Sequence, residues 1–157
     1  MRDVQFINKC MIKEDALEHY RKLERMYALA PINQFYRPTL QVQEGAAVLT
    51  IPVREAFHHT AGAMHGSVYF KALDDAAFFA ANSLVQDVFV LTATFELTFL
   101  RPVQSGDIRA EGKVIGHEGR RILASSTLFD AHGTKVAEGS GTFALSKISL
   151  NQEVGYL

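Results

Sequence analysis

The sequence predicts an α+β fold in which one long antiparallel sheet wraps around a central helix, with a further helix near the N-terminus. Three observations predict it. Residues 66–84 form a helical pattern that is apolar on most sides, four strand patterns follow without another helix, and a helix and two strands precede it. A less specific α+β sandwich fits the same order. The 157 residues suit one domain, which we place at residues 1–157.

The first predicted elements are a helix and a hairpin. Apolar residues recur at helical spacing between residues 13 and 30, and Pro31 ends the pattern. Apolar and polar residues then alternate in Thr39 to Gln43 and in Ala46 to Val53, with the turn Glu44-Gly45 between them. This arrangement is typical of two antiparallel strands.

The segment from Gly66 to Leu84 predicts the central helix. It is too long for a strand, and it has few β-branched residues. Its alanines let other backbone approach closely, while its bulky apolar side chains spread around the axis. A helix that is apolar on most sides is a core helix.

Four strand patterns follow the central helix, and a turn that contains glycine precedes each of the last three. Closely spaced strands with such turns pair as antiparallel neighbours. The predicted strands are residues 89–100, 107–117, 120–130 and 134–146.

The composition excludes several classes of protein. A formal net charge of −1 provides no overall field that would attract a polyanion, which weighs against a nucleic-acid binder. No window approaches the run of about 20 apolar residues that a membrane span needs, and residues 1–20 are too polar for a signal peptide. Cys10 is the only cysteine, which favours a reducing compartment. We expect a cytoplasmic protein with neither nucleic acid nor membrane as a partner.

Two adjacent aspartates in the central helix are the first candidates for chemistry. Asp74 and Asp75 differ by about 100° around the helix axis, so they face different surroundings. Asp75 can pair with Lys71 at the i, i+4 spacing, which is a structural role. Asp74 shares its face with Phe70 and Ala77 and has no such partner. The pattern therefore favours Asp74 for chemistry and Asp75 for structure.

The start of the central helix is a second candidate. Free backbone N–H groups lie there, and Gly66, which lacks a Cβ, lets another molecule's carbonyl approach its N–H. The plainer interpretation is that Gly66 simply begins a helix that packs closely against a sheet. Asp74 lies about 12 Å further along the axis, at about 1.5 Å per residue. The two residues can serve one site only if a second copy brings its own helix alongside, antiparallel to the first.

A cluster of histidines precedes the helix, at His58, His59 and His65. Their spacing matches no helical pair of metal ligands, and no cysteine joins them. We expect no metal site.

Several short motifs then occur in a recognisable order. A loop ends in His65-Gly66-Ser67, and Asp74 follows nine positions after the histidine. The stretch LTATFELTFLRPV spans residues 91–103, and a pattern GRR…D..G..VAEG.GTF spans residues 119–143. Together these motifs resemble the hotdog-fold acyl-CoA thioesterases, in particular those of the phenylacetate-pathway type. The resemblance covers roughly residues 40–146, the core of the domain.

The resemblance implies the hotdog fold and the hydrolysis of a thioester. In this family the backbone N–H of the glycine after the histidine polarises the thioester carbonyl, a role that falls to Gly66 beside His65. The acidic residue, here Asp74, is nucleophile or general base and comes from the opposing subunit. A Ser or Thr helps to place the water, and Thr92 is the better match, Thr94 the next.

Two positions depart from the family pattern. The residue six positions before the histidine is usually Asn or Gln and assists at the carbonyl, but here it is His59. The second glycine of the family's HGG motif is Ser67. His59 can still donate a hydrogen bond, and its charge would vary near neutral pH.

The substrate implied by the resemblance is an acyl-CoA, and no separate cofactor is expected. Coenzyme A carries phosphates that need cations, and the candidates are Arg101, Lys113, Arg120, Arg121 and Lys135. Because alternate residues of a strand face opposite sides, only one of the adjacent arginines is expected to serve. The acyl group needs an apolar pocket, for which the candidates are Phe57, Met64, Phe70 and Phe78, although the same residues could be core.

The resemblance also implies a homo-oligomer, a dimer at least and by preference a tetramer. Two other functions fit the same sequence. One is an acyl-CoA-binding module without turnover, for which the loss of the usual amide at His59 argues. The other is a hotdog hydratase or dehydratase that pairs Asp74 with His65 or His59 across the interface.

Overall fold

The computed structural model describes the backbone of residues 2–157 and the side chains from Glu14 onward. Its elements, in chain order, are α1 (Arg2–Leu29), α2 (Pro31–Tyr36), β1 (Thr39–Gln43), β2 (Ala46–Pro52), η1 (Glu55–Phe57), α3 (Gly66–Asn82), β3 (Val88–Phe99), β4 (Asp107–Glu118), β5 (Arg121–Phe129), β6 (Lys135–Ser149) and η2 (Gln152–Val154).

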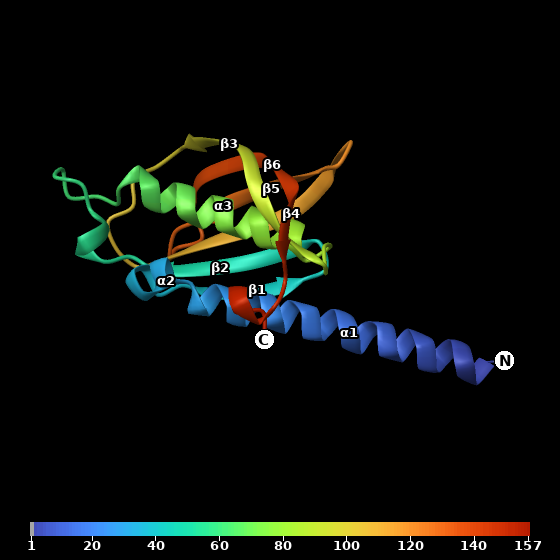
Figure 1. Cartoon of the computed structure of the whole chain (residues 1–157). Helices are drawn as coiled ribbons and strands as arrows, with labels where there is room; N and C mark the ends of the chain where they lie inside the picture. Colours follow the sequence, from blue (N-terminus) through green and yellow to red (C-terminus); the bar gives the residue numbers. More distant parts are fainter. Residues whose placement is uncertain (1) are drawn as a thin grey trace.

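All six strands form one antiparallel sheet in the order β1-β2-β4-β5-β6-β3. The sheet curves around α3, which runs along its concave face (Figure 1). β1 and β3 are the two edges, so the strand that follows α3 in the chain lies at the far side of the sheet from the first hairpin. The predicted architecture, one long antiparallel sheet around a central helix, is confirmed.

The helix α3 lies very close to the sheet. Its alanines are fully buried, as predicted for small residues that let another backbone approach. A Cβ on Gly112 of β4 would lie 2.1 Å from the carbonyl oxygen of Ala76, so only glycine fits there. The Ser126 hydroxyl of β5 donates to the carbonyl of Leu73 at 2.7 Å. These contacts fix the rotation of α3 and therefore the direction in which each of its polar side chains points.

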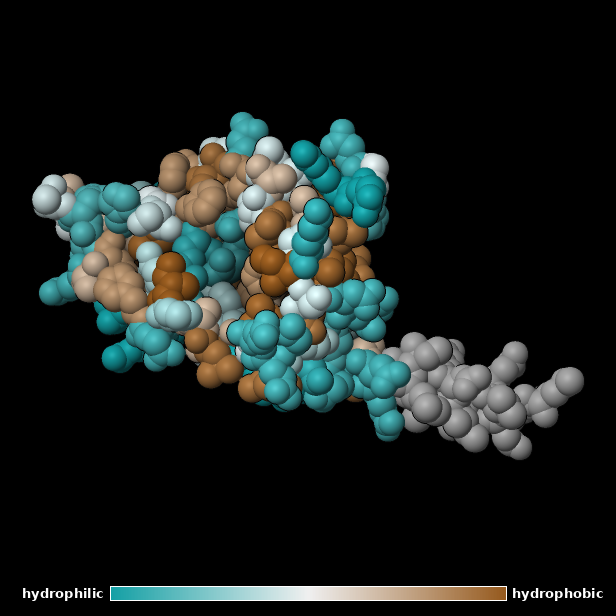
Figure 2. Space-filling view, viewed as in Figure 1, coloured by the Kyte–Doolittle hydropathy of each residue, from teal (hydrophilic) through white to brown (hydrophobic). Residues whose placement is uncertain are grey.

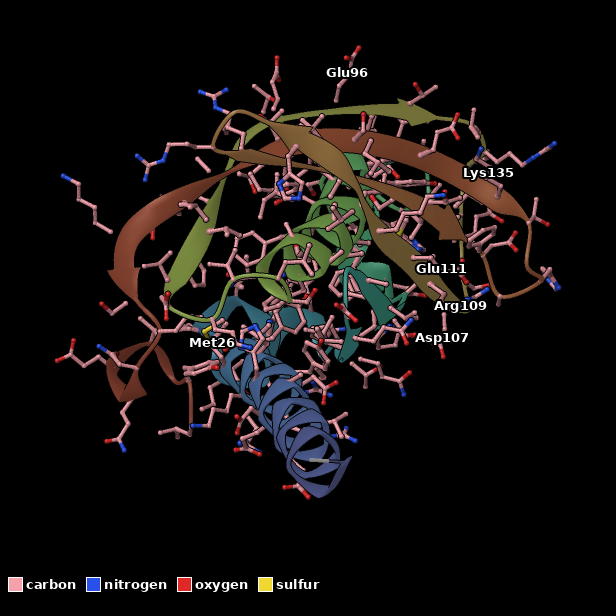
Figure 3. The ribbon with its side chains drawn as sticks, turned by 90° about the vertical axis from the view of Figure 1, so that its right-hand side faces the viewer. Met26, Glu96, Asp107, Arg109, Glu111 and Lys135 are labelled. Carbon is pink, nitrogen blue, oxygen red and sulfur yellow. The ribbon has the colours of Figure 1, made fainter. Side chains whose placement is uncertain are left out.

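The helix α1 lies against the side of α3 that the sheet leaves open (Figure 3). Leu23 and Met26 are buried there, and the ring of Tyr27 packs edge-on against Phe79 at 4.9 Å between centroids. His19 is also buried. Its ring is within hydrogen-bonding distance of the Tyr156 hydroxyl, 2.7 Å, and of the Asn82 carbonyl, 3.0 Å. α1 is thus tied to both α3 and the end of the chain.

The structure adds three short helices that were not predicted, α2, η1 and η2. Pro31 does end the first helix, but it also begins α2, because proline needs no N–H in a first helical turn. η2 follows β6 and is capped by the side chain of Asn151, which accepts from the N–H of Glu153 at 2.9 Å. The three residues of η2 are too few and too polar to show a helical period in the sequence.

The central helix ends two residues earlier than predicted. The side chain of Asn82 donates to the carbonyls of Val85 and Val88 and accepts from the N–H of Val90 at 3.0 Å. These bonds turn the chain toward β3 at the end of the helix. Within the described part of the chain, no helix is long and apolar enough to cross a membrane.

Candidate active site

Asp74 is the half-buried carboxylate of α3. Thr92 of the neighbouring strand β3 donates a hydrogen bond from its hydroxyl to Oδ1 of Asp74, at 2.9 Å. Burial is the main cause that raises the pKa of Asp74 to about 6, and the hydrogen bond from Thr92 partly offsets it. The nearby charges have smaller effects: Asp75 raises the pKa, and Lys71 lowers it. A carboxyl group with this pKa is ionised at neutral pH and close to the value that suits a general base.

Asp75 has a full set of partners, unlike its neighbour. Lys71 bonds to Oδ2 at 2.7 Å, which confirms the predicted i, i+4 pair. The Tyr27 hydroxyl donates to the same oxygen at 2.5 Å, and burial together with this carboxylate raises the pKa of Tyr27. Lys71 also lies over the rings of Tyr27 and Tyr36. Asp75 therefore links α3 to α1.

A pocket of about 760 Å³ opens beside the two aspartates. It lies between α3 and β3 on one side and the end of α1, α2 and the C-terminal segment on the other. Figure 2 shows apolar side chains gathered in the middle of the face on which β3 and this segment lie. The apolar side chains that line the pocket are Met26, Leu29, Ala30, Pro31, Ile32, Phe78, Phe79, Phe89, Leu91, Ile148, Val154 and Leu157, and the reacting candidates Asp74 and Thr92 line it too.

The N-terminus of α3 forms a separate polar centre. His65 is the N-cap, and its Nδ1 accepts from the N–H of Ser67 at 3.1 Å and lies 2.8 Å from the Ser67 hydroxyl. Among the residues described here, none accepts a hydrogen bond from the backbone N–H of Gly66. A Cβ on Gly66 would lie 3.1 Å from Cζ of the Phe99 ring, which is a tight contact. The Gly66 N–H is a donor that a carbonyl oxygen could reach.

One chain does not bring these two centres together. Asp74 and Gly66 are separated by about 12 Å along the helix axis. His59, the predicted second donor, lies in the exposed loop before α3, where Nδ1 accepts from the N–H of Ala61 at 3.1 Å. His65, Gly66, Ser67 and His59 thus lie at one end of α3, whereas Asp74 and Thr92 lie at its middle.

The predicted acyl-binding residues are divided by the structure. Phe78 lines the pocket beside Phe89, at 5.0 Å between ring centroids. Phe57 and Met64 are buried in the core away from the pocket, and Phe57 packs against Tyr36. Phe70 is 42% exposed and contacts Phe95, also outside the pocket.

The predicted cations are all on the surface, and none lines the pocket. The backbone of Arg101 is tied to α3, since its carbonyl accepts from the Tyr69 hydroxyl at 2.9 Å. Arg120 lies in the β4–β5 turn and Arg121 begins β5, so the expected alternation along a strand does not apply to this pair. Lys113 is exposed on β4, and Lys135 pairs with Glu138.

The second predicted threonine, Thr94, does not lie beside Asp74. It is within 2.8 Å of the Thr142 hydroxyl on β6, and either hydroxyl can donate. Among the described side chains no group of three or more His, Cys, Asp or Glu could hold a metal ion. The side chain of Cys10 lies outside the described residues.

Sequence reasoning missed Tyr27 and the C-terminal residues of the pocket. Tyr27 was predicted only as an apolar position of the first helix, and its bond to Asp75 spans 48 residues. No local pattern encodes such a contact. The tail after residue 149 shows neither periodicity nor a motif.

Part of the chain is similar to a known family of proteins. Residues 61–137 match the family model described as "Thioesterase superfamily". Over 126 residues the chain is 25% identical to "Putative esterase SSO2140" of Saccharolobus solfataricus, covering 80% of this chain and 86% of that protein.

Solved structures are similar as well. The PaaI protein of the E. coli phenylacetic acid degradation operon superposes with a TM-score of 0.77, at 19% identity, over 85% of this chain and 97% of that one. A thioesterase family protein from Silicibacter pomeroyi gives a TM-score of 0.72, at 22% identity, over 82% and 99%. The predicted hotdog fold is confirmed.

Proposed function

We propose that this chain is an acyl-CoA thioesterase of the phenylacetate-pathway type, which hydrolyses an acyl or aryl-acyl thioester with Asp74 as the reacting carboxylate. The observation that carries the proposal is the half-buried Asp74, which Thr92 orients at the wall of an apolar pocket. The family match and the esterase name of the archaeal relative support thioester hydrolysis as the general class of reaction. The phenylacetate type rests on the order of the motifs around His65 and Asp74.

The complete site requires a second copy of the chain. β3 is an edge strand, and it carries Leu91 and Phe99 at 47% and 57% exposure. An open edge with exposed apolar side chains favours pairing with another strand. Two β3 edges that pair antiparallel about a two-fold axis would place their α3 helices antiparallel. Gly66 of one subunit would then face Asp74 of the other, and dimers would pair further into a tetramer.

The chemistry follows from these positions. The thioester carbonyl oxygen accepts from the Gly66 N–H, with His59 as a second donor. The Asp74 carboxylate takes a proton from a water while the water oxygen forms a bond to the carbonyl carbon. The tetrahedral oxyanion gains most from the Gly66 N–H. The C–S bond then breaks, and the thiolate takes the proton from Asp74, which gives coenzyme A and the free acid and restores the carboxylate. Direct attack by Asp74, with hydrolysis of the resulting anhydride, is the alternative route.

The two ends of the substrate meet different surfaces. The pocket receives the acyl group, and Phe78, Phe79 and Phe89 give it aromatic walls suited to an aryl group. The nucleotide end meets surface cations. Arg101 is the first candidate, because its backbone is held at the first turns of α3.

The test is thiol release from short, long and aromatic acyl-CoAs, with wild type beside Asp74→Asn and Asp75→Asn. We expect turnover of one class, a loss of about 10³-fold or more in Asp74→Asn, and a far smaller loss in Asp75→Asn. The two variants carry the same substitution at adjacent positions, so a loss confined to Asp74→Asn is specific to that carboxylate.

Three other outcomes would contradict the proposal. Tight binding of acyl-CoA without turnover would show a binding module, and hydration of an enoyl thioester would show a hydratase. Full activity in Asp74→Asn would show that another group reacts.

A further inference from the structure

We infer that the C-terminal segment, residues 150–157, forms the end wall of the acyl pocket and determines how long an acyl group the enzyme accepts. This inference rests on the proposed function, since it names the specificity determinant of the same site.

The position of the segment supports this role. η2 lies beside α1 (Figure 1), and Met26 lies on the side of α1 that faces the segment (Figure 3). Asp74 and Thr92 line the pocket from α3 and β3, while Gln152, Glu153, Val154, Gly155 and Leu157 line it from the segment. An acyl group whose carbonyl lies at Asp74 and whose chain enters the pocket therefore extends toward these residues.

The segment is held in place by specific contacts with α1. The Tyr156 hydroxyl meets Nδ1 of His19 at 2.7 Å, and His19 is itself buried. Arg25 donates from Nε to the Leu157 carbonyl oxygen at 2.6 Å. The first contact joins the segment to the packed interior, and the second fixes its end. A wall attached in this way resists displacement by a substrate.

Gly155 provides the turn that carries the segment past α1. Its φ of +81° is in the left-handed region, which favours glycine, whereas a Cβ there would make only ordinary contacts with Leu29 and Met26. The glycine turns the chain so that Val154 and Leu157 both reach the pocket. Val154 and Leu157 are apolar, so the part of the wall that they form favours the end of a hydrocarbon or aromatic group, beside the polar Gln152 and Glu153.

A fixed apolar wall discriminates by length. An acyl group that stops short leaves apolar surface in contact with water, and one that is too long must displace packed residues. A single methylene in such a pocket changes kcat/KM by about 10-fold or more. Substitutions that move the wall should therefore shift the preferred length while the chemistry at Asp74 continues.

Two variants move the wall in opposite directions. Leu157→Ala removes part of it and should shift the optimum to longer acyl groups, with the ratio of kcat/KM for long to short substrates rising about tenfold. Val154→Phe fills the pocket and should shift the ratio the other way. Leu17→Ala is the control, because Leu17 lies on α1 outside the pocket and is 56% exposed, similar to Leu157 at 48%. Its ratio should equal that of wild type.

The readout has two parts, so that failure of the wall and failure of the proposed function are distinguishable. The first is kcat/KM over a length series of acyl-CoAs. The second is the affinity for non-hydrolysable acyl-CoA ethers of the same lengths, measured by calorimetry, which needs no turnover. If the preferred length in binding shifts with the variants but no substrate is hydrolysed, the role of the segment is supported and the proposed thioesterase activity is wrong. If all variants prefer the same length, or none binds at any length, the proposed role of the segment is wrong.

Discussion

At the scale of the residue, Asp74 and Asp75 show how two identical neighbours acquire different roles. Among the side chains from Glu14 onward, Lys71 and Tyr27 bond to the carboxylate of Asp75, whereas Thr92 alone donates to that of Asp74, which stays half-buried at the pocket. The pKa of Asp74, raised to about 6 by burial, gives a test of its role. Since only the ionised carboxylate can accept a proton, kcat/KM should rise with pH through about 6 and then level off. Thr92→Val removes a bond that lowers the pKa, so its midpoint should move to higher pH. A flat profile from pH 4.5 to 8.5 would exclude Asp74 as the base.

The same pKa has a consequence for stability. Because the folded pKa lies above the ordinary 3.8, the native state binds the proton more tightly than the unfolded chain. The free energy of unfolding therefore falls as pH rises from 3.8 to about 6, and the cost is complete above that range. Asp74→Asn should be more stable than wild type by up to about 3 kcal/mol at pH 7.5 and by much less at pH 4. Urea denaturation at both pH values measures this difference.

Asp75→Asn should instead be less stable than wild type at pH 7.5, since it leaves the largely buried Lys71 unpaired.

At the scale of the element, the first turn of α3 offers a way to remove one donor alone. Proline is favoured at the first helical position, and His65 before it already has φ −66° and ψ 144°, which a following proline requires. Gly66→Pro should keep the helix while deleting the N–H. We expect kcat to fall about 10²- to 10³-fold, the usual effect of losing an oxyanion donor. Gly66→Ala places a similar Cβ against Phe99 but keeps the N–H, so it controls for crowding. Equal losses in both variants would show that the N–H has no part in the reaction.

The elements also show which features a sequence can predict. The central helix and the strands were predicted within a few residues, because periodicity and glycine turns are local signals. The Lys71–Asp75 pair follows from helical spacing alone. The Tyr27–Asp75 bond does not, because it depends on how α1 lies against α3. For the same reason, Phe57 and Met64 could not be separated from Phe78, since all are apolar and only the fold decides which of them lines the pocket.

At the scale of the whole molecule, the separation of Gly66 and Asp74 along α3 predicts a site shared by two subunits. A mixed dimer distinguishes it from a site within one chain. If Gly66 of one subunit serves Asp74 of the other, Asp74→Asn and Gly66→Pro homodimers are both inactive. In a mixed dimer the two defects fall in one site, and the other site has both residues intact. Random mixing gives half mixed dimers, each with one working site, so co-expression should restore about a quarter of wild-type activity. Different affinity tags on the two chains allow the mixed dimer to be purified and its composition to be checked by mass spectrometry. A verified mixed dimer without activity would place the whole reaction within a single chain, and the Gly66 N–H would then have to be replaced by a donor near Asp74 itself.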